Sequence, residues 1–172
     1  MKTMTYVGIA ALGLAMGAIG IGAYLSKAAA TDNAPAPHVA YTLLDGTPAN
    51  TAALQGKVVM VNFWATTCVV CVQEMPQLVA THKLFEARGL QTLAVAMRYD
   101  PPAYVVDFAQ RKKLPFSVVI DNTGAMARAY GDVQGTPTTL LINKQGRIVK
   151  RYVGASDFNE LQQRLDGLLK EG

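Results

Sequence analysis

The stretch of sequence that decides the fold is KVVMVNFWATTCVVC, which covers residues 57–71. Its first part is a nearly continuous apolar run, which is typical of a parallel strand buried on both faces. Its last part holds Cys68 and Cys71, the two cysteines of the whole chain. A Cys-x-x-Cys pair beside strand and helix patterns that form βαβ units is a redox signature. We therefore expect a buried strand that delivers the chain to a helix beginning at Cys68.

The chemistry of the pair follows from this place at the start of a helix. Unpaired backbone N–H groups and the helix dipole stabilise a thiolate there, which lowers the pKa of the Cys68 thiol below its ordinary range. The Cys68 thiolate is the expected nucleophile. Cys71 lies one helical turn further on and is expected to be more buried, where it can resolve a mixed disulfide.

Two other uses of the cysteines agree less well with the sequence. A structural zinc site usually needs four ligands, and the two histidines, His38 and His82, lack convincing ligand spacing. His82 is interpreted as a helix-surface residue. A purely structural disulfide would close a loop of three residues, which stabilises a fold little. We expect no metal ligands, and no cofactor beyond the redox-active Cys68–Cys71 disulfide.

The rest of the chain alternates between strand and helix patterns. Strands are expected at residues 39–44, 57–65, 90–97, 116–120, 138–143 and 147–153. Helices are expected from the cysteines to about 88, at 101–113, at 123–130 and from 157 to about 169. Asp100 and Ser156 are the predicted N-caps of two of these helices. The pattern predicts an α/β fold with a central mixed sheet flanked by helices, because helices separate the parallel strands and a final hairpin adds antiparallel ones.

The N-terminus departs most from the composition of a globular protein. From Thr3 to Ser26 there is no charged side chain. As a helix, this segment would span roughly 36 Å, enough to cross a bilayer core. A signal peptide has a shorter apolar region, although Ala28-Ala29-Ala30 could supply its cleavage site. The longer stretch favours an uncleaved transmembrane helix.

These features predict three parts: residues 1–27 as a membrane anchor or signal peptide, 28–38 as a linker, and 39–172 as the folded domain. The expected location is the bacterial inner (cytoplasmic) membrane, crossed once. The catalytic domain is placed on the periplasmic, extracytoplasmic side, mainly because an exported disulfide enzyme makes chemical sense. The net charge is +4, and without Lys2 and Lys27 it falls to +2, with 14 basic against 12 acidic residues. Nucleic-acid binding usually shows a clustered basic face, so this mild excess predicts no nucleic-acid partner.

Two segments resemble a known family. They are FWATTCVVCVQEMP at residues 63–76 and YGDVQGTPTTLLINKQGRI at residues 130–148. Both are similar to thioredoxin-like proteins of the TlpA/ResA type, which are exported and often membrane-anchored thiol–disulfide reductases. The resemblance spans about residues 39–169. It implies a thioredoxin-like fold with an N-terminal strand extension and a central helix–strand insertion near residues 98–120.

The resemblance also implies roles for three residues near the dithiol. Pro137 would be a cis-proline that faces the disulfide, in a loop that offers backbone groups to an incoming peptide. Thr136 would hold the position that modulates redox behaviour. Trp64 would pack beside the disulfide, and we group it with Thr136 and Pro137 as substrate-binding.

The carboxylate that assists the thiols is expected at an unusual place. Ordinary thioredoxins carry a buried aspartate where this chain has Asn62, whereas the resemblance points to Glu74. Glu74 lies three residues after Cys71, a spacing that returns it to the same helix face. It could accept a proton from Cys71. The simpler alternative is a solvated glutamate on the helix surface.

The sequence therefore predicts an exported reductase of disulfides in client proteins, with apocytochrome c or copper-site assembly proteins as examples. The resemblance implies a membrane thiol reductase as its electron donor. The Val69-Val70 pair favours a reductase, because no proline, histidine or lysine lies between the cysteines.

Two other functions agree less well with the sequence. The first is a Cu(I)-handling binding protein that uses the two thiolates, although no histidine lies near Pro137. The second is a peroxiredoxin-like peroxidase, although Ala65 stands where that family has a threonine, three residues before its cysteine.

Overall fold

A sheet of six strands forms the centre of the structure, a computed structural model that describes residues 33–171. The strands lie in the order β1 (Ala34–Pro35), β8 (Arg147–Val153), β7 (Thr138–Ile142), β4 (Val58–Trp64), β5 (Leu90–Ala96) and β6 (Ser117–Ile120). The pairs β4–β5 and β5–β6 are parallel, whereas β1–β8, β8–β7 and β7–β4 are antiparallel. This arrangement confirms the predicted α/β fold with a central mixed sheet.

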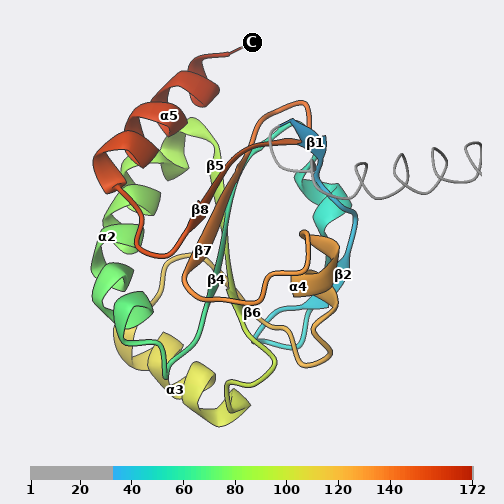
Figure 1. Cartoon of the computed structure of the whole chain (residues 1–172), viewed down its shortest axis with the longest axis vertical. Helices are drawn as coiled ribbons and strands as arrows, with labels where there is room; N and C mark the ends of the chain where they lie inside the picture. Colours follow the sequence, from blue (N-terminus) through green and yellow to red (C-terminus); the bar gives the residue numbers. More distant parts are fainter. Residues whose placement is uncertain (1–32, 172) are drawn as a thin grey trace, which may run out of the picture. The chain divides into compact units, whose positions relative to one another are not determined.

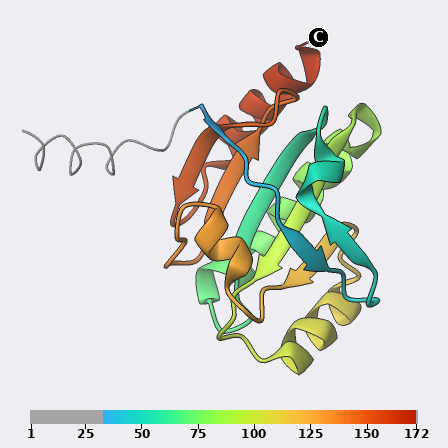
Figure 2. The same ribbon diagram turned by 90° about the vertical axis from the view of Figure 1, so that its right-hand side faces the viewer.

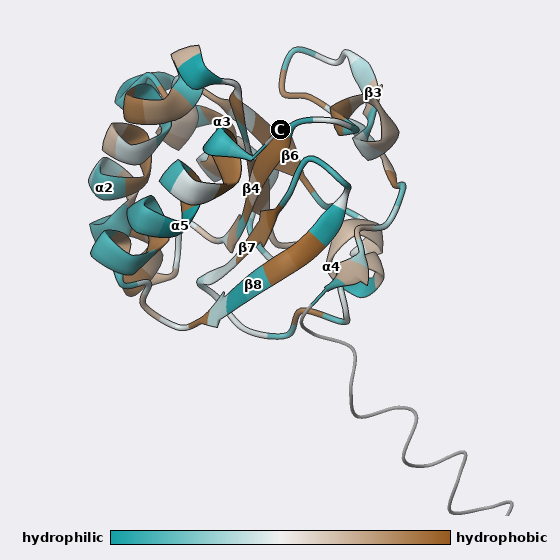
Figure 3. Ribbon diagram, turned by 90° about the horizontal axis from the view of Figure 1, so that it is seen from above, coloured by the Kyte–Doolittle hydropathy of each residue, from teal (hydrophilic) through white to brown (hydrophobic). Residues whose placement is uncertain are grey.

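Helices cover both faces of this sheet. Helices α2 (Val69–Phe85), α3 (Pro102–Lys112) and α5 (Phe158–Lys170) lie on one face of the sheet (Figure 1) and contribute to one hydrophobic cluster. Helix α4 (Ala125–Ala129) packs into a second cluster on the other face, together with residues from the N-terminal part of the domain (Figure 2). Figure 3 shows hydrophilic residues on the outer sides of α2 and α5 and hydrophobic residues along the central strands.

Strand β4 determines where the dithiol lies. All seven of its residues are buried, because β5 and β7 pair with its two edges and its side chains alternate between the two hydrophobic clusters that cover the two faces of the sheet. The predicted two-sided burial is therefore confirmed. Strands β4 and β5 are parallel and end side by side, with Trp64 opposite Ala96. Because the carboxyl ends of parallel strands meet at one edge of a sheet, the loop before Cys68 and the loop after β5 are neighbours.

The chain pairs with the central sheet before residue 39, where the folded domain was expected to begin. Ala34 pairs with Ile148 of β8, and the Ala36 N–H donates to the Gly146 carbonyl at 2.8 Å. The sheet thus begins inside the segment predicted as a linker, residues 28–38. The expected strand at 39–44 is shorter: β2 (Ala40–Thr42) pairs with β3 (Pro48–Asn50) in a separate hairpin.

Several helix boundaries differ from the prediction by one or two residues. Helix α2 continues into one turn of 3₁₀ helix, the element η2 (Glu86–Arg88), and ends at Gly89, whose φ of 102° suits glycine. A second 3₁₀ element, η1 (Thr51–Leu54), follows β3. Helix α4 is shorter than the predicted 123–130 because Gly124, with a φ of 72°, is in the left-handed region and delays its start.

Both predicted N-caps are wrong. Helix α3 begins at Pro102, with Pro101 in the capping position, and the carboxylate of Asp100 contacts a different loop. Helix α5 is capped by Asp157, whose carboxylate accepts hydrogen bonds from the N–H groups of Asn159 and Glu160. Ser156 lies one residue before this cap. At α3 a tertiary contact with Thr66 engages the Asp100 carboxylate, whereas at α5 the neighbouring Asp157 takes the capping position.

The predicted membrane anchor, residues 1–27, lies outside the described residues. Within residues 33–171, each helix is too short or too polar to cross a bilayer. The predicted central insertion corresponds to α3 and β6, which follow β5 in the chain.

Candidate active site

Cys68 and Cys71 form a disulfide at the start of α2, with their Cα atoms 5.2 Å apart. Cys68 is the N-cap residue of this helix, in extended backbone conformation. It is half-buried, whereas Cys71 is only 4% exposed. The two sulfur atoms therefore differ in access, as expected for an attacking and a resolving cysteine.

The start of the helix supplies the polar groups around Cys68. The Cys71 N–H donates to the Cys68 Sγ at 3.1 Å, so the sulfur acts as the capping acceptor. The first turn carries no acidic residue, and Val69 and Val70 are exposed apolar side chains between the cysteines. A Cys68 thiolate would thus be stabilised by backbone N–H groups and the helix dipole, with no cationic side chain in this turn.

Glu74 lies on α2 one turn after Cys71 and is half-buried. Its Oε1 accepts a hydrogen bond of 2.6 Å from the Ser156 N–H, just before α5. Burial raises the pKa of Glu74, and the Ser156 N–H opposes this shift in part. Such a carboxyl can hold or release a proton closer to neutral pH than an exposed glutamate. Its part in proton transfer stays a prediction.

A chain of polar contacts connects Glu74 with the position of the missing aspartate. The buried Asn62 donates from Nδ2 to the Thr139 Oγ1 at 2.9 Å, across the β4–β7 pair. The Ser156 Oγ lies 3.5 Å from the same Thr139 oxygen, and its N–H contacts Glu74. Asn62 and Glu74 therefore face one polar region from two sides. A carboxylate on the helix can serve the region that a carboxylate on the strand would serve.

The loop before β7 contains the predicted proline. The peptide bond between Thr136 and Pro137 is cis, as expected. The Pro137 carbonyl accepts a hydrogen bond of 2.9 Å from the Gly154 N–H, and the Thr138 Oγ1 donates to the Gly135 carbonyl at 2.8 Å. These contacts fix the loop on the end of the β7–β8 pair. Contact of Thr136 and Pro137 with a client stays a prediction.

The expectation that Trp64 binds substrate needs a correction. Its side chain is 0% exposed and packs against the Phe108 ring, with the centroids 5.2 Å apart. It belongs to the same hydrophobic cluster as Cys71. Trp64 therefore supports the disulfide from inside the core and offers no surface to a client in this state.

Two residues that sequence reasoning missed connect the loops around the disulfide. Asp100, 2% exposed, accepts hydrogen bonds from the Thr66 N–H at 2.6 Å and the Thr66 Oγ1 at 2.5 Å. Its neighbour Tyr99 has its hydroxyl 3.2 Å from the Thr136 Oγ1. The loop after β5 thus contacts both the cysteine loop and the proline loop. The Asp-Pro sequence suggested a helix cap instead, and no local signal predicted these contacts.

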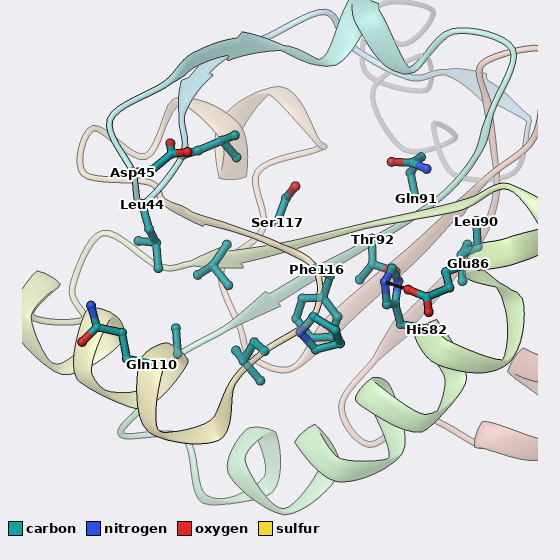
Figure 4. Close-up of a pocket in the computed structure, with 15 residues that line it drawn as sticks. Leu44, Asp45, His82, Glu86, Leu90, Gln91, Thr92, Gln110, Phe116 and Ser117 are labelled. Atoms are coloured by element: carbon teal, nitrogen blue, oxygen red, sulfur yellow. Dashed lines mark hydrogen bonds and ion pairs between the residues drawn. The ribbon is translucent and has the colours of Figure 1, made fainter.

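The structure also has a cavity of about 600 Å³, shown in Figure 4. His82 lies in its wall, with Nδ1 3.1 Å from the Thr92 Oγ1 and Nε2 3.1 Å from a Glu86 carboxylate oxygen. His82 is 6% exposed, so its interpretation as a helix-surface residue is wrong. Neither cysteine lines this cavity. Within residues 33–171, no group of three or more histidine, cysteine or acidic side chains could hold a metal ion.

The fold and the dithiol together define a class. The Cys-x-x-Cys disulfide lies at a helix start, after the central strand of a mixed sheet, and a cis-proline loop leads into β7, which pairs with that strand. This is the arrangement of a thioredoxin-like thiol–disulfide oxidoreductase. The chain belongs to the Redoxin family, whose model matches residues 30–165.

Relatives of known class agree with this assignment. The chain is 32% identical over 145 residues to the thiol-disulfide oxidoreductase ResA of Geobacillus thermodenitrificans, covering 84% of this chain and 82% of the relative. The ResA protein of Bacillus subtilis is 30% identical over 149 residues, with 87% and 82% covered. A solved thiol:disulfide interchange protein of Chlorobium tepidum superposes with a TM-score of 0.73 at 27% identity, covering 82% of this chain and 99% of that one. The protein is thus a thiol–disulfide oxidoreductase of the ResA type, and its clients are proteins that carry disulfides.

Proposed function

We propose that this enzyme reduces disulfides in exported proteins, with its domain held outside the cytoplasmic membrane by residues 1–27. The observation that carries the proposal is the environment of Cys68. This residue is accessible at the start of α2, Cys71 is buried behind it, and uncharged valines separate the two. The apolar segment from Thr3 to Ser26 supports export and anchoring.

The direction of electron flow follows from the stability of the reduced form. A strongly stabilised thiolate makes a dithiol–disulfide pair oxidising, as in DsbA. Here the first turn offers no cationic side chain, and the carboxylate of Glu74 follows one turn after Cys71. A nearby negative charge disfavours a thiolate. Both features favour the disulfide form, which makes the reduced enzyme a good electron donor.

The reaction balances as two thiol–disulfide exchanges. The Cys68 thiolate attacks one sulfur of the client disulfide, forms a mixed disulfide and releases the first client thiolate. The Cys71 thiolate then attacks the Cys68 sulfur, which forms the disulfide seen here and releases the second client thiolate. Two electrons pass to the client, whose thiolates take up two protons. We propose a membrane thiol reductase as the dithiol that reduces the enzyme again.

Clients of two kinds are consistent with this proposal: apocytochrome c, whose haem-binding cysteines must be reduced, and proteins that assemble copper sites. The Cys71→Ser variant can identify them in intact membranes. It should accumulate mixed disulfides through Cys68, which mass spectrometry would identify. The double variant Cys68→Ser/Cys71→Ser is the control, and equal capture by both variants would contradict the proposal.

The reduction potential tests the direction separately. Equilibration of the full chain with glutathione should give a value closer to that of thioredoxin, about −270 mV, than to that of DsbA, about −120 mV. A potential near the DsbA value would assign the enzyme to disulfide formation instead.

A further inference from the structure

A second hollow lies between the end of β5, helix α4 and the loop that leads to Pro137. Its volume is about 270 Å³. Its polar lining consists of Arg98, Tyr99, Arg128, Asp132 and Gln134. Two guanidinium groups and one carboxylate therefore share the hollow, which leaves it with an excess of positive charge.

The side chains of Arg98, after β5, and Arg128, in α4, both lie next to Gly124. A Cβ atom built on Gly124 would lie 3.1 Å from the Arg128 Nη1 and 3.2 Å from the Arg98 Cδ. Glycine at this position therefore leaves room for both side chains. The Arg128 Nη1 also donates to the Thr123 carbonyl at 2.9 Å, which holds this guanidinium in place.

Neither arginine is neutralised within the part of the chain that the structure describes. The ion pairs of residues 33–171 involve neither Arg98 nor Arg128, and Asp132 does not come within pairing distance of either. Both side chains are exposed. Two like charges brought together repel each other, and an anion between them would relieve that repulsion. Arginine pairs suit a carboxylate well, because the guanidinium binds it in bidentate geometry.

The hollow adjoins the surface on which a client would lie. Tyr99 lines it and contacts Thr136, the residue before Pro137. Gln134 lines it two residues before Thr136. Asp100, next to Tyr99, holds Thr66 in the loop before Cys68. A polypeptide that lies along the proline loop with its disulfide at Cys68 would pass this hollow.

We propose that the hollow between Arg98 and Arg128 binds a carboxylate side chain of the client, so that the enzyme prefers clients with an aspartate or glutamate a few residues from the reactive cysteine. This inference rests on the proposed reductase function and names a feature of its substrates. Asp132 also lines the hollow, and its negative charge would weaken the binding of a client carboxylate there.

The test compares disulfide-bonded peptides that differ at one position. Each pair carries glutamate or glutamine at one site within five residues of the cysteine. The full chain, reduced and freed of reductant, is mixed with each peptide at low salt, and oxidation of the enzyme is followed by mass spectrometry after acid quench. At one or two positions, the glutamate peptide should react roughly three- to tenfold faster than its glutamine partner, a modest factor because the arginines are exposed.

Enzyme variants test whether the hollow causes the preference for glutamate. In Arg98→Gln/Arg128→Gln the ratio of glutamate to glutamine rates should fall to about one, with the glutamine peptide as the internal reference for folding and thiol chemistry. Arg111→Gln, an exposed arginine on α3 that pairs with Asp107, should keep the wild-type ratio. Asp132→Asn should raise the ratio, and added salt should lower the wild-type ratio. These last two measurements need no arginine variant.

The outcomes separate the two proposals. Equal rates for glutamate and glutamine at every position in the wild-type enzyme would overturn the inference and leave the reductase function intact. Failure to reduce any peptide would overturn both. If millimolar sulfate slowed both peptides of a pair equally, the hollow would be a site for a free anion, and the client preference would be wrong.

Discussion

Replacing Glu74 by glutamine separates the charge of this residue from its shape. Glutamine keeps an oxygen that can accept the hydrogen bond from the Ser156 N–H, so the contact between α2 and the start of α5 should survive. The free energy of unfolding should therefore change little. What is lost is a negative charge and a possible proton acceptor, one turn from Cys71.

The expected size of the charge effect follows from the helix geometry. Side chains three residues apart on a helix are about 5–6 Å apart. At about 6 Å, a unit charge changes the energy of a thiolate by roughly 0.7 kcal/mol in water and about 3 kcal/mol at an effective dielectric constant of 20. Glu74 is half-buried and lies between these limits. The pKa of the nearest thiol should therefore fall by about one unit in Glu74→Gln.

Exchange should nevertheless become slower near neutral pH. Loss of a general base typically costs 10²–10⁴-fold, and we expect about 10²-fold because the thiol is already acidic. Wild type and variant should converge as the pH falls and Glu74 takes up a proton. Burial raises the pKa of Glu74, so convergence should begin at a higher pH than for an exposed glutamate.

The assay is a pH profile of thiol alkylation and of disulfide exchange for both proteins. Glu86→Gln, the same change of charge after the far end of α2, is the matched control and should leave both profiles unchanged. If the profiles of wild type and Glu74→Gln superimpose, the carboxylate takes no part in the mechanism and only anchors Ser156.

Two further predictions concern the cysteines and the loop that precedes them. Limiting iodoacetamide should label Cys68 before Cys71 in the reduced protein, because Cys71 is 4% exposed; preferential labelling of Cys71 would reverse their roles. Thr66→Val removes one of the two hydrogen bonds to the buried carboxylate of Asp100 and should lower the free energy of unfolding by about 1–3 kcal/mol, whereas Thr66→Ser should restore most of it. Urea unfolding measures both variants, and equal stability of Thr66→Val and wild type would show that Asp100 needs only the backbone N–H.

The sequence predicted most strands and helices, but it misassigned polar groups at their ends. A continuous apolar run predicts a buried strand, as at Val58–Trp64. Asp100 and Ser156 are good helix caps by local rules. The Asp100 carboxylate instead accepts hydrogen bonds from Thr66, 34 residues away, and the Ser156 backbone N–H donates to Glu74, 82 residues away. Contacts over such separations leave no trace in local composition, so only the fold could assign them.

The sequence by itself determined the chemistry of this protein, because a Cys-x-x-Cys pair after a buried strand already defines a dithiol at the start of a helix. It also placed Glu74 on the face of Cys71, since helical spacing is a local property. The tertiary structure decided what surrounds that dithiol. It brought Asn62 and Glu74 to one polar region, buried Trp64 in the core cluster that also contains Cys71, and gathered Arg98 and Arg128 at Gly124. These neighbours come from different strands, helices and loops, and only the packing of the whole fold fixes their distances.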